Sequence, residues 1–204
     1  MGVLRKAILI SGQQGSGKTT TANRVVQELW AQNYKAVKFR FADPLYQMHD
    51  AVRAVLKRYK LDDLQGIDGP LLQLLGTEWG RNTRGHDIWV RAFKASVLDY
   101  WFMNPDGIVV VDDCRFENEF KVFDSEAHVS VVHVRLRAPK EVRKLRAEKW
   151  RDNDQHPSET GLDGLSDAWF PVVADTSVES VSSVAGRIVH EIINKSYRTS
   201  LSSK

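Results

Sequence analysis

The residues with the clearest chemical purpose lie near the start of the chain, where a short apolar run ends in a glycine-rich turn. The segment from Gly12 to Thr19, GQQGSGKT, fits the pattern G-x-x-x-x-G-K-[ST], which binds phosphate groups in nucleotide-binding proteins. Gly12, Gly15 and Gly17 permit backbone angles closed to other residues, so that successive N–H groups can converge on an anion. The motif lies between a predicted strand and a predicted helix, as it must. The sequence therefore predicts a nucleoside triphosphate site.

Two side chains of this segment complete the predicted site. Lys18 is expected to reach the β- and γ-phosphates, and the Thr19 hydroxyl is expected to bind Mg²⁺. The helix that follows adds the positive end of its dipole. The residues predicted to hold the nucleotide are those of the loop and the first helical turn: Gly12, Gln14, Gly15, Ser16, Gly17, Lys18, Thr19 and Thr20. The alternative is a glycine-rich turn that binds no ligand.

A second polar cluster follows the most apolar strand segment of the chain, residues 108–111. A protein with such a phosphate loop needs a carboxylate at the end of a neighbouring strand to position Mg²⁺, and Asp112 and Asp113 suit this role. Arg115 lies two residues further on, where ligands bind in open α/β sheets, and can clamp a phosphate through two parallel hydrogen bonds. The alternatives are that the two acids only end the strand and that Arg115 pairs with Glu119.

Five arginines cluster before and along a very polar helix, which is predicted from residue 140 to about residue 151. Phosphoryl transfer spreads negative charge over the equatorial oxygens, and arginines from a mobile segment can stabilise that charge. At least two of the five are expected to touch the triphosphate or the transferring group: Arg135, Arg137, Arg143, Arg146 and Arg151. The alternative is a solvated, charged helix face.

The rest of the chain must position these groups. Its 204 residues predict one domain, with the 42% hydrophobic and 27% charged content of a soluble globular protein. A net charge of +3 suits a small anionic ligand as well as nucleic acid. The single cysteine, Cys114, excludes a disulfide framework and is expected to be a small buried hydrophobe. No apolar run approaches the roughly 18 residues that span a bilayer, and the basic start does not resemble a signal peptide, so a cytoplasmic protein is expected.

Short apolar segments alternate with helical patterns along the chain. The predicted strands are residues 7–10, 36–41, 108–111, 129–136 and 170–175. Three helices are expected within residues 44–104, the first with Asp43 as N-cap, the second opened by residues 68–70 and ending near Gly80. A closing helix is expected from residue 178 to about 193, with a frayed tail after Lys195. This alternation predicts an α/β fold with a parallel sheet, helices on both faces and a helical insertion.

Five segments of the chain occur in an order that resembles a known family. They are GQQGSGKT at 12–19, FADPL at 41–45, LQLLGTEWGR at 72–81, VDDCRFENE at 111–119 and HPSE at 156–159. Together they resemble the deoxynucleoside monophosphate kinases of the kind found in bacteriophages, within the P-loop kinase fold. The resemblance extends from about residue 6 to residue 193, and the third and fourth segments carry its most specific motifs.

The resemblance implies transfer of the γ-phosphate of ATP, with Mg²⁺, to a deoxynucleoside 5′-monophosphate. It implies a single three-layer domain over residues 1–204, with a central parallel sheet of about five strands. Residues 44–104 would be the monophosphate-binding insertion, and residues 139–162 would be a lid over the nucleotides. The implied catalytic residues are Lys18, Arg115, Arg143, Arg146 and Arg151. Further implied contacts are Arg137, Asp175 and Thr176 for ATP, and Asp43, Trp79, Arg81, Arg115, His156, Ser158 and Glu159 for the acceptor.

Several of these implied roles have structural alternatives. Asp43 is also expected as a helix cap, Trp79 as a core residue, and residues 156–159 as a capped turn. The acidic pair departs from the family, which more often has a neutral residue at the position of Asp112. We therefore favour Asp113 as the metal ligand.

Three other functions compete with this interpretation. The first is a P-loop kinase of another small metabolite, such as dephospho-coenzyme A or a sugar acid. The second is a nucleotide-dependent switch, but the only Asn-Lys pair, at residues 194–195, lacks the following aspartate of a guanine-reading motif. The third is a nucleic-acid-dependent ATPase, which the modest charge and the lack of a recognition motif disfavour. The expected partners are small nucleotides and no membrane, and a homodimer is compatible with the sequence.

Overall fold

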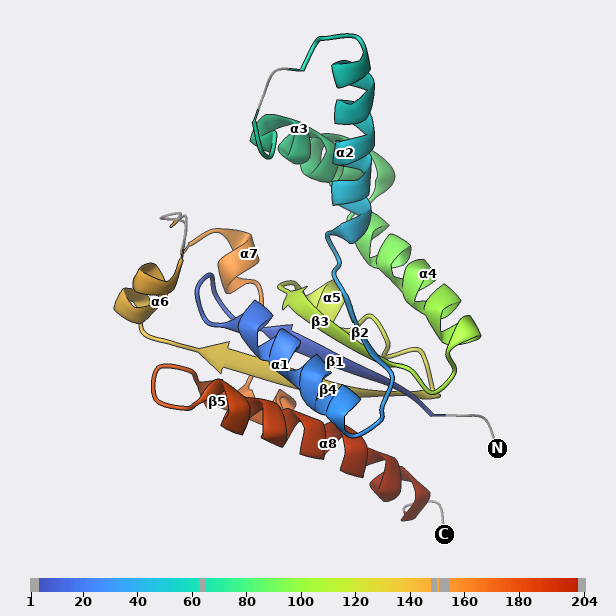
Figure 1. The fold of residues 1–204 in the computed structure, drawn as a ribbon, viewed down its shortest axis with the longest axis vertical. Coiled ribbons are helices and arrows are strands. Elements are labelled where there is room, and N and C mark those ends of the chain that lie inside the picture. The colour runs from blue at the N-terminus through green and yellow to red at the C-terminus, as the bar shows by residue number, and fades with distance from the viewer. Residues whose placement is uncertain (1–3, 63–64, 148–149, 151–154, 202–204) are drawn as a thin grey trace. The chain divides into compact units, whose positions relative to one another are not determined.

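A five-stranded sheet forms the centre of the protein in the computed structural model, which describes residues 4–62, 65–147, 150 and 155–201. All neighbouring strands are parallel, in the order β2-β3-β1-β4-β5 (Figure 1). The strands are β1 (Arg5–Ser11), β2 (Ala36–Phe39), β3 (Ile108–Cys114), β4 (Val129–Arg137) and β5 (Val172–Asp175). The prediction of an α/β fold around a parallel sheet of about five strands is confirmed.

Helices fill most of the remaining chain. They are α1 (Lys18–Ala31), α2 (Asp43–Arg58), α3 (Gly69–Gln73), the π-helix η1 (Leu74–Arg84), α4 (Ile88–Met103), α5 (Glu117–Phe120), α6 (Lys140–Arg146), α7 (Pro157–Thr160), the 3₁₀-helix η2 (Asp167–Trp169) and α8 (Val181–Leu201). The chain divides into two compact units, a helical unit over Phe41–Ser96 and a sheet unit made of the rest. None of the helices in the described residues has the length and apolar character that crossing a membrane requires.

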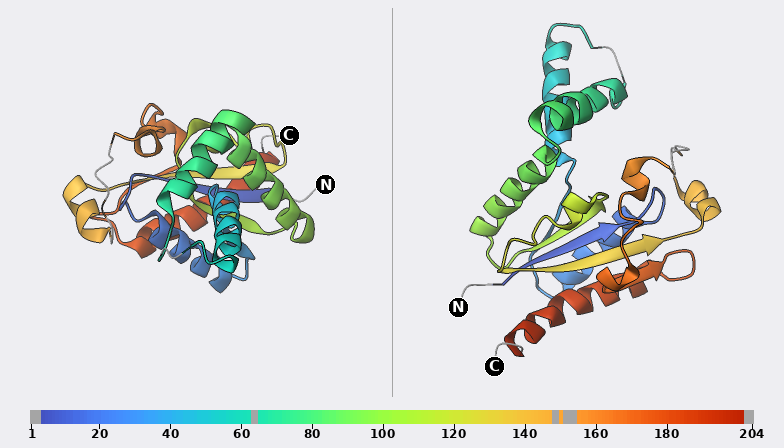
Figure 2. Two further views of the ribbon diagram at one scale, coloured as in Figure 1. Left: turned by 90° about the horizontal axis from the view of Figure 1, so that it is seen from above. Right: turned by 180° about the vertical axis from the view of Figure 1, so that it is seen from behind.

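Alternation along the strands builds the core of the sheet unit. Ile8 and Ile10 of β1 belong to one buried cluster with side chains of α1 and α8, which cover the same face of the sheet (Figure 2). Ala7 and Leu9 point to the opposite face and are equally buried. A strand that is buried on both faces is apolar at every position, which is why β1 reads as a continuous apolar run. Each buried isoleucine or leucine side chain of β1 contributes roughly 1.5–3 kcal/mol through burial.

The register of the strands brings their carboxyl ends to one edge of the sheet. Ser11 at the end of β1 pairs with Cys114 of β3 and with Arg135 of β4. Arg137 at the end of β4 pairs with Asp175 at the end of β5. The loops that follow these four strands therefore start next to one another, and they carry most of the predicted site residues.

The helical unit is held by its own contacts. Asp68 accepts a hydrogen bond from the Leu71 N–H at 3.0 Å and caps α3, which confirms the predicted helix start. The helix does not end near Gly80 as expected but continues to Arg84 as a π-helix. Gly80 is buried, and a Cβ atom there would lie 2.8 Å from the Trp89 ring, so the glycine permits a close contact inside the helix instead of ending it.

Other predicted boundaries also differ from the structure. Helix α2 begins at Asp43 itself, with Ala42 at the N-cap, so Asp43 lies in the first turn and is not the cap. Helix α6 ends at Arg146, because the next residue has an extended backbone, and Arg151 lies outside the described residues. Helix α8 runs from Val181 to Leu201 instead of ending near residue 193. Its later start follows from Ser180, whose hydroxyl accepts a hydrogen bond from the Ser183 N–H at 3.2 Å.

Candidate phosphate-binding site

The loop between β1 and α1 is packed tightly against neighbouring backbone. Gly12 has φ 144° and Gly15 has φ 78°, values that side chains disfavour. A Cβ atom on Gly15 would lie 2.5 Å from the Arg143 carbonyl oxygen, and one on Gly12 would clash with the Leu136 carbonyl oxygen. The two glycines are therefore required both by the curvature of the loop and by its contact with β4 and α6.

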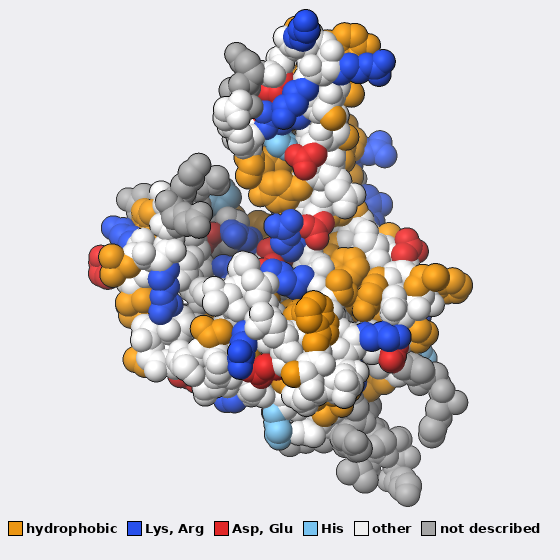
Figure 3. All heavy atoms as spheres, viewed as in Figure 1, with side chains coloured by type: hydrophobic (Ala, Val, Ile, Leu, Met, Phe, Trp, Pro, Cys, Tyr) orange, Lys and Arg blue, Asp and Glu red, His pale blue; other side chains and the backbone are white. Residues whose placement is uncertain are grey.

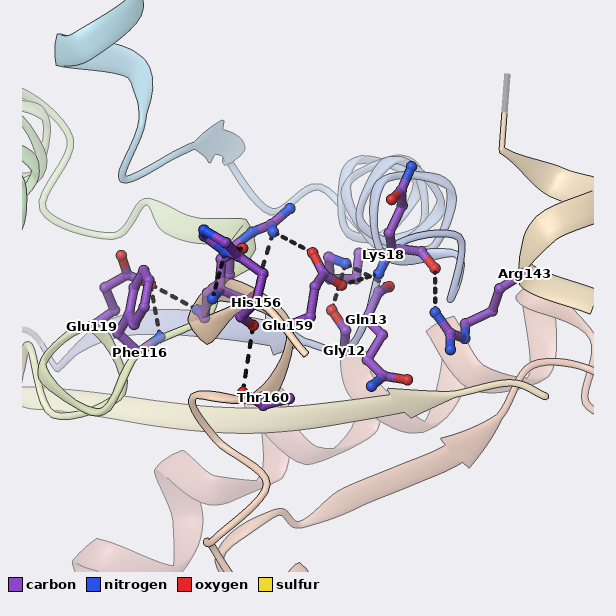
Figure 4. Close-up of polar contacts among 12 residues, drawn as sticks. Gly12, Gln13, Lys18, Phe116, Glu119, Arg143, His156, Glu159 and Thr160 are labelled. Carbon is purple, nitrogen blue, oxygen red and sulfur yellow. Dashed lines mark hydrogen bonds and ion pairs between the residues drawn. The ribbon is translucent and has the colours of Figure 1, made fainter. Parts of the chain in front are cut away.

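Lys18 at the start of α1 folds back over this loop. Its Nζ donates hydrogen bonds to the Gly12 carbonyl at 2.6 Å and to the Gln13 carbonyl at 2.9 Å (Figure 4). Burial, together with the positive charge of Arg115, lowers the pKa of Lys18 to about 8, against the opposing effect of Glu159. The side chain is 9% exposed, so its charge is poorly solvated in the protein alone. A ligand phosphate beside it would stabilise the ammonium form.

Glu159 of α7 places a carboxylate directly on the loop. Its Oε2 accepts a hydrogen bond from the Gln14 backbone N–H at 2.5 Å, and its Oε1 accepts one from Arg115 Nη1 at 2.7 Å (Figure 4). The Glu159 side chain is 2% exposed. A loop amide and an arginine at the end of β3 therefore bind anionic oxygens of one group, which is the chemistry expected of a phosphate site.

Arg115 is held in place through its own backbone. Glu119 accepts hydrogen bonds from the N–H groups of Arg115 and Phe116, at 2.7 and 3.1 Å. The predicted alternative of an Arg115–Glu119 ion pair is therefore wrong, because the Arg115 guanidinium pairs with Glu159 instead.

His156 Nδ1 accepts a hydrogen bond from the Ser158 N–H at 3.2 Å and lies 2.8 Å from the Ser158 hydroxyl. Residues 156–158 thus form the cap that begins α7, as the capped-turn alternative states.

Two arginines of α6 contact the phosphate loop or its support. Arg143 is buried and donates to the Gln14 carbonyl at 3.1 Å. Arg146 donates to the Thr176 hydroxyl at 2.9 Å, and that hydroxyl donates to the Ser16 carbonyl at 3.1 Å. In this arrangement both side chains bind peptide or hydroxyl oxygens, so they brace the loop from α6.

The two arginines at the end of β4 are engaged with the segment that follows α7. Arg135 donates to Asp167 Oδ1 at 2.7 Å and lies 3.9 Å from the centre of the Phe170 ring. Arg137 donates to the same Asp167 oxygen at 2.7 Å. The hydrogen bond from Arg135 lowers the pKa of Asp167 below its usual value. Asp175 receives hydrogen bonds from the backbone and the hydroxyl of Ser177, which lower its pKa and shape the loop after β5.

The acidic pair of β3 divides into a buried and a half-buried carboxylate. Asp112 is 4% exposed, and its Oδ2 lies 3.0 Å from Lys38 Nζ. Asp113 is half-buried. Lys38 compensates the charge of Asp112, and the predicted metal ligands remain Asp113 and the exposed Thr19 in the first turn of α1. Cys114 is buried, as expected of a small buried hydrophobe, and burial raises its pKa well above the usual value.

A cavity of about 340 Å³ lies beside the loop. Its lining includes Gly12, Gln13, Ser16, Arg115, Arg143 and Glu159. The Ser16 hydroxyl is buried and has no hydrogen-bond partner among the residues that the structure describes. Buried polar groups are normally satisfied, so this hydroxyl is consistent with a ligand or a bound water at the loop. The donor groups around the loop fit a nucleoside triphosphate with Mg²⁺.

The remaining predicted residues belong to the helical unit. Asp43 and Arg81 are half-buried, in α2 and η1. Trp79 is 38% exposed, with the Arg84 guanidinium 6.0 Å from its ring centre, so the alternative of a core tryptophan is wrong. Figure 3 shows basic side chains gathered over the C-terminal end of α2, where the last turn is basic.

Several contacts at the site were not predicted from the sequence. Among them are those that join Glu159 to Gln14, Lys38 to Asp112, and Asp167 to the two β4 arginines. Lys38 carries a weak signal, because the alternating apolar and basic residues of β2 place a cation next to the acidic end of β3. The other two join segments 30 or more residues apart, and no local pattern identifies them.

Comparison with known proteins agrees with this architecture. No curated protein sequence matches the chain. Among solved structures, a sugar kinase from Janibacter sp. HTCC2649 is similar with TM-score 0.53 and 19% identity, covering 91% of this chain and 92% of that chain. A gluconokinase from Sinorhizobium meliloti 1021 has TM-score 0.51 and 12% identity, covering 99% of each chain. The APS kinase of Mycobacterium tuberculosis, in complex with AMPPNP and APS, has TM-score 0.50 and 14% identity, covering 92% and 97%.

These structures share the P-loop kinase fold with the chain. A family model described as an AAA domain, AAA_18, matches residues 8–161. This range begins in β1, includes the whole phosphate loop and ends just after α7, so it spans more than half of the chain. The chain therefore belongs to the AAA domain family AAA_18.

Proposed function

We propose that this protein transfers the γ-phosphate of ATP to a deoxynucleoside 5′-monophosphate, giving the diphosphate and ADP. The observation that carries the proposal is the anion-binding site at the carboxyl edge of the sheet. There a loop amide, Lys18 and Arg115 surround one carboxylate, that of Glu159. A site for two phosphorylated molecules needs donors of this kind on both sides of the transferring group.

The chain's own groups divide the work of binding. The loop amides and Lys18 would hold the β- and γ-phosphates, and Arg115 would hold the phosphate of the acceptor. Mg²⁺, bound by Thr19 and by Asp113 directly or through water, would neutralise phosphate charge. An oxygen of the acceptor phosphate attacks the γ-phosphorus, and the bond from that phosphorus to the bridging oxygen breaks. ADP leaves with the bonding electrons, so the protein needs no covalent nucleophile.

The family resemblance supplies the acceptor and lid assignments within this proposal. In the helical unit, Asp43, Trp79 and Arg81 would contact the monophosphate. Residues 139–162 would act as the lid, with His156 and Ser158 near the acceptor. Arg137, Asp175 and Thr176 would lie along the adenine side. The lid's arginines, Arg143 and Arg146, would have to leave Gln14 and Thr176 to touch phosphate directly, so their first role is to brace the loop.

A second candidate is a kinase of another small metabolite. The fold neighbours favour it, because they are named as a sugar kinase, a gluconokinase and an APS kinase. All share the phosphate-loop architecture, whereas the acceptor site is what would differ. This candidate keeps the roles of Lys18 and the loop and changes those of Asp43, Trp79 and Arg81.

An acceptor panel separates the two candidates. We expect ATP and Mg²⁺ to support turnover of at least one of the four deoxynucleoside monophosphates, measured as equal amounts of ADP and the diphosphate. Gluconate, adenosine phosphosulfate and dephospho-coenzyme A serve as competing acceptors. Turnover of one of these, with none of the monophosphates, would contradict the proposal and support the second candidate.

Variants of the acceptor side refine the same test. Arg81→Ala should raise the KM for the accepted monophosphate about 10- to 100-fold, the usual effect of losing a charged hydrogen bond, and leave the KM for ATP unchanged. Arg58→Ala removes an exposed arginine of the same unit and should change neither constant. A rise in the KM for ATP alone would contradict the role of Arg81.

A further inference from the structure

The Glu159 carboxylate lies where the phosphate loop would otherwise bind a ligand oxygen. It takes the Gln14 N–H at 2.5 Å, and its second oxygen takes the Arg115 guanidinium at 2.7 Å. The side chain is 2% exposed, so this is a buried charge with partners on both oxygens. The segment that carries it, α7, is far from the loop in sequence but next to it in space (Figure 4).

We propose that Glu159 is an internal competitor for the phosphate loop, which a nucleotide must displace before it binds. A carboxylate satisfies the Gln14 amide and the Arg115 guanidinium in the protein alone, and leaving either group buried and unpaired is costly. A triphosphate brings more negative charge and more acceptor oxygens to the same donors, so it can replace the carboxylate. The affinity for nucleotide is therefore reduced by the free energy of the Glu159 contacts.

Displacement of Glu159 also frees Arg115. While Arg115 is paired with Glu159, it cannot hold the phosphate of an acceptor through the same nitrogen. Nucleotide binding would break this pair and make the guanidinium available at the end of β3. Occupation of the loop would thus favour acceptor binding, and by linkage the acceptor would favour the nucleotide equally. This step rests on the proposed function of Arg115, whereas the competition itself rests only on the phosphate-binding role of the loop.

The direct test measures binding without any acceptor. The probes are a non-hydrolysable ATP analogue with Mg²⁺ and, separately, inorganic triphosphate, titrated calorimetrically into the full chain. Glu159→Gln keeps the shape of the side chain and loses its charge, so it should bind both probes about tenfold more tightly than the wild type. Equal or weaker binding by a folded Glu159→Gln protein would overturn the proposal.

A matched variant distinguishes the effect of losing the Glu159 contacts from the effect of removing one negative charge near the cavity. Asp163→Asn removes one negative charge from an exposed residue that lines the same cavity and has no contact with the loop amide. It should change the affinity for either probe less than twofold, the size expected of a screened surface charge. A gain as large as that of Glu159→Gln would overturn the proposal, because the effect would then be one of net charge.

A measurement on the wild type covers the case in which the variant does not fold. In protein labelled with ¹³C at glutamate carboxyl groups, the Glu159 resonance should move on addition of inorganic triphosphate, as its hydrogen bonds to Gln14 and Arg115 are lost. An unmoved Glu159 resonance in the presence of bound triphosphate would overturn the displacement.

The coupling to the acceptor is tested last. In the wild type, the ATP analogue should tighten binding of the accepted monophosphate several-fold, and in Glu159→Gln this ratio should fall toward one. Failure of every monophosphate to bind would contradict the proposed function, while the tenfold change for triphosphate would still stand. A tight monophosphate complex with no effect of Glu159→Gln on triphosphate would contradict the competition alone.

Discussion

The phosphate loop and the helical unit use charged residues in different ways. At the loop, the recognising groups are mostly backbone N–H groups, and the charged side chains around them, Lys18, Arg143 and Glu159, are buried. In the helical unit, the candidate contact residues are side chains on helices, and Trp79 is 38% exposed. Arg53 and Asp62 of that unit form a buried charged pair, with Arg53 Nε 2.6 Å from Asp62 Oδ2.

This difference bears on how the sheet unit and the helical unit would each recognise a ligand. Backbone donors recognise a phosphate whatever group it is attached to, so one loop can serve kinases with many acceptors. Side chains on a separate unit can be exchanged without disturbing that loop. Under the proposed function, we expect the chemistry of the donor to depend on the sheet unit and the choice of acceptor to depend on the helical unit.

The largest effect is expected from Lys18→Ala. Loss of the Lys18 ammonium group, which lies on the loop, should lower kcat about 10³-fold, as does loss of a donor that stabilises charge in the transition state. The fold should persist, because the change removes a buried charge and leaves the glycines of the loop intact. Phosphoryl transfer and circular dichroism, measured on the same preparation, check both expectations.

Lys121→Ala is the control for Lys18→Ala. Lys121 forms an exposed ion pair with Glu117 in the sheet unit, with both side chains more than half exposed. Its removal should leave turnover unchanged. Near-normal turnover by Lys18→Ala would contradict the role of Lys18 and the phosphate loop in phosphoryl transfer.

Local sequence patterns were enough to predict the sheet unit's framework. The strands were identified because continuous apolar runs occur where a sheet is buried on both faces, and the loop because its glycines have fixed spacing. The limits of α6 and α8 were missed, since helix ends depend on single backbone angles and caps such as that of Ser180. The π-helix was missed because Gly80 reads as a helix end until Trp89 is seen packed against it.

The site itself was predictable in its residues more than in its contacts. Glu159 was expected to lie near the acceptor, but its hydrogen bond to Gln14 joins residues 145 positions apart. The pairing of Asp112 with Lys38 likewise depends on β2 lying beside β3, which the sequence order does not show. Such contacts depend on which elements the fold brings together, whereas a single sequence shows only the two residues and not that they meet.

A smaller effect is expected from pH, because the buried Lys18 of the sheet unit makes the free energy of unfolding depend on pH. The pKa of Lys18 is about 8 in the folded protein and near its usual 10.5 in the unfolded chain. Below pH 8 both states are protonated, and the folded state carries the full cost of the buried charge. Between pH 8 and 10.5 the unfolded state binds a proton that the folded state has released. The free energy of unfolding should therefore rise with pH in this window, by about 3 kcal/mol in total.

Lys18→Met isolates this contribution from those of other groups. The difference in unfolding free energy between wild type and Lys18→Met, from urea denaturation at several pH values, should move by about 3 kcal/mol from pH 7.5 to 10.5. A saturating ATP analogue should reduce that movement, because bound phosphates favour the ammonium form. Parallel profiles for the two proteins would mean that Lys18 is solvated in the folded state.

The smallest effect is expected from Gly80→Ala, which asks whether the helical unit can be disturbed alone. A Cβ atom at Gly80 would lie 2.6 Å from the Leu75 carbonyl oxygen and 2.8 Å from the Trp89 ring, so η1 must shift. Overpacking of this kind costs roughly 1–3 kcal/mol, measurable by denaturation. Gly69→Ala is the matched control, since it adds a methyl group to open space at the start of α3 and should be neutral. If the helical unit recognises the acceptor and the sheet unit recognises the donor, Gly80→Ala raises the KM for the acceptor and leaves the affinity for the ATP analogue unchanged. An equal loss of affinity for both ligands would show that donor and acceptor recognition depend on one structure.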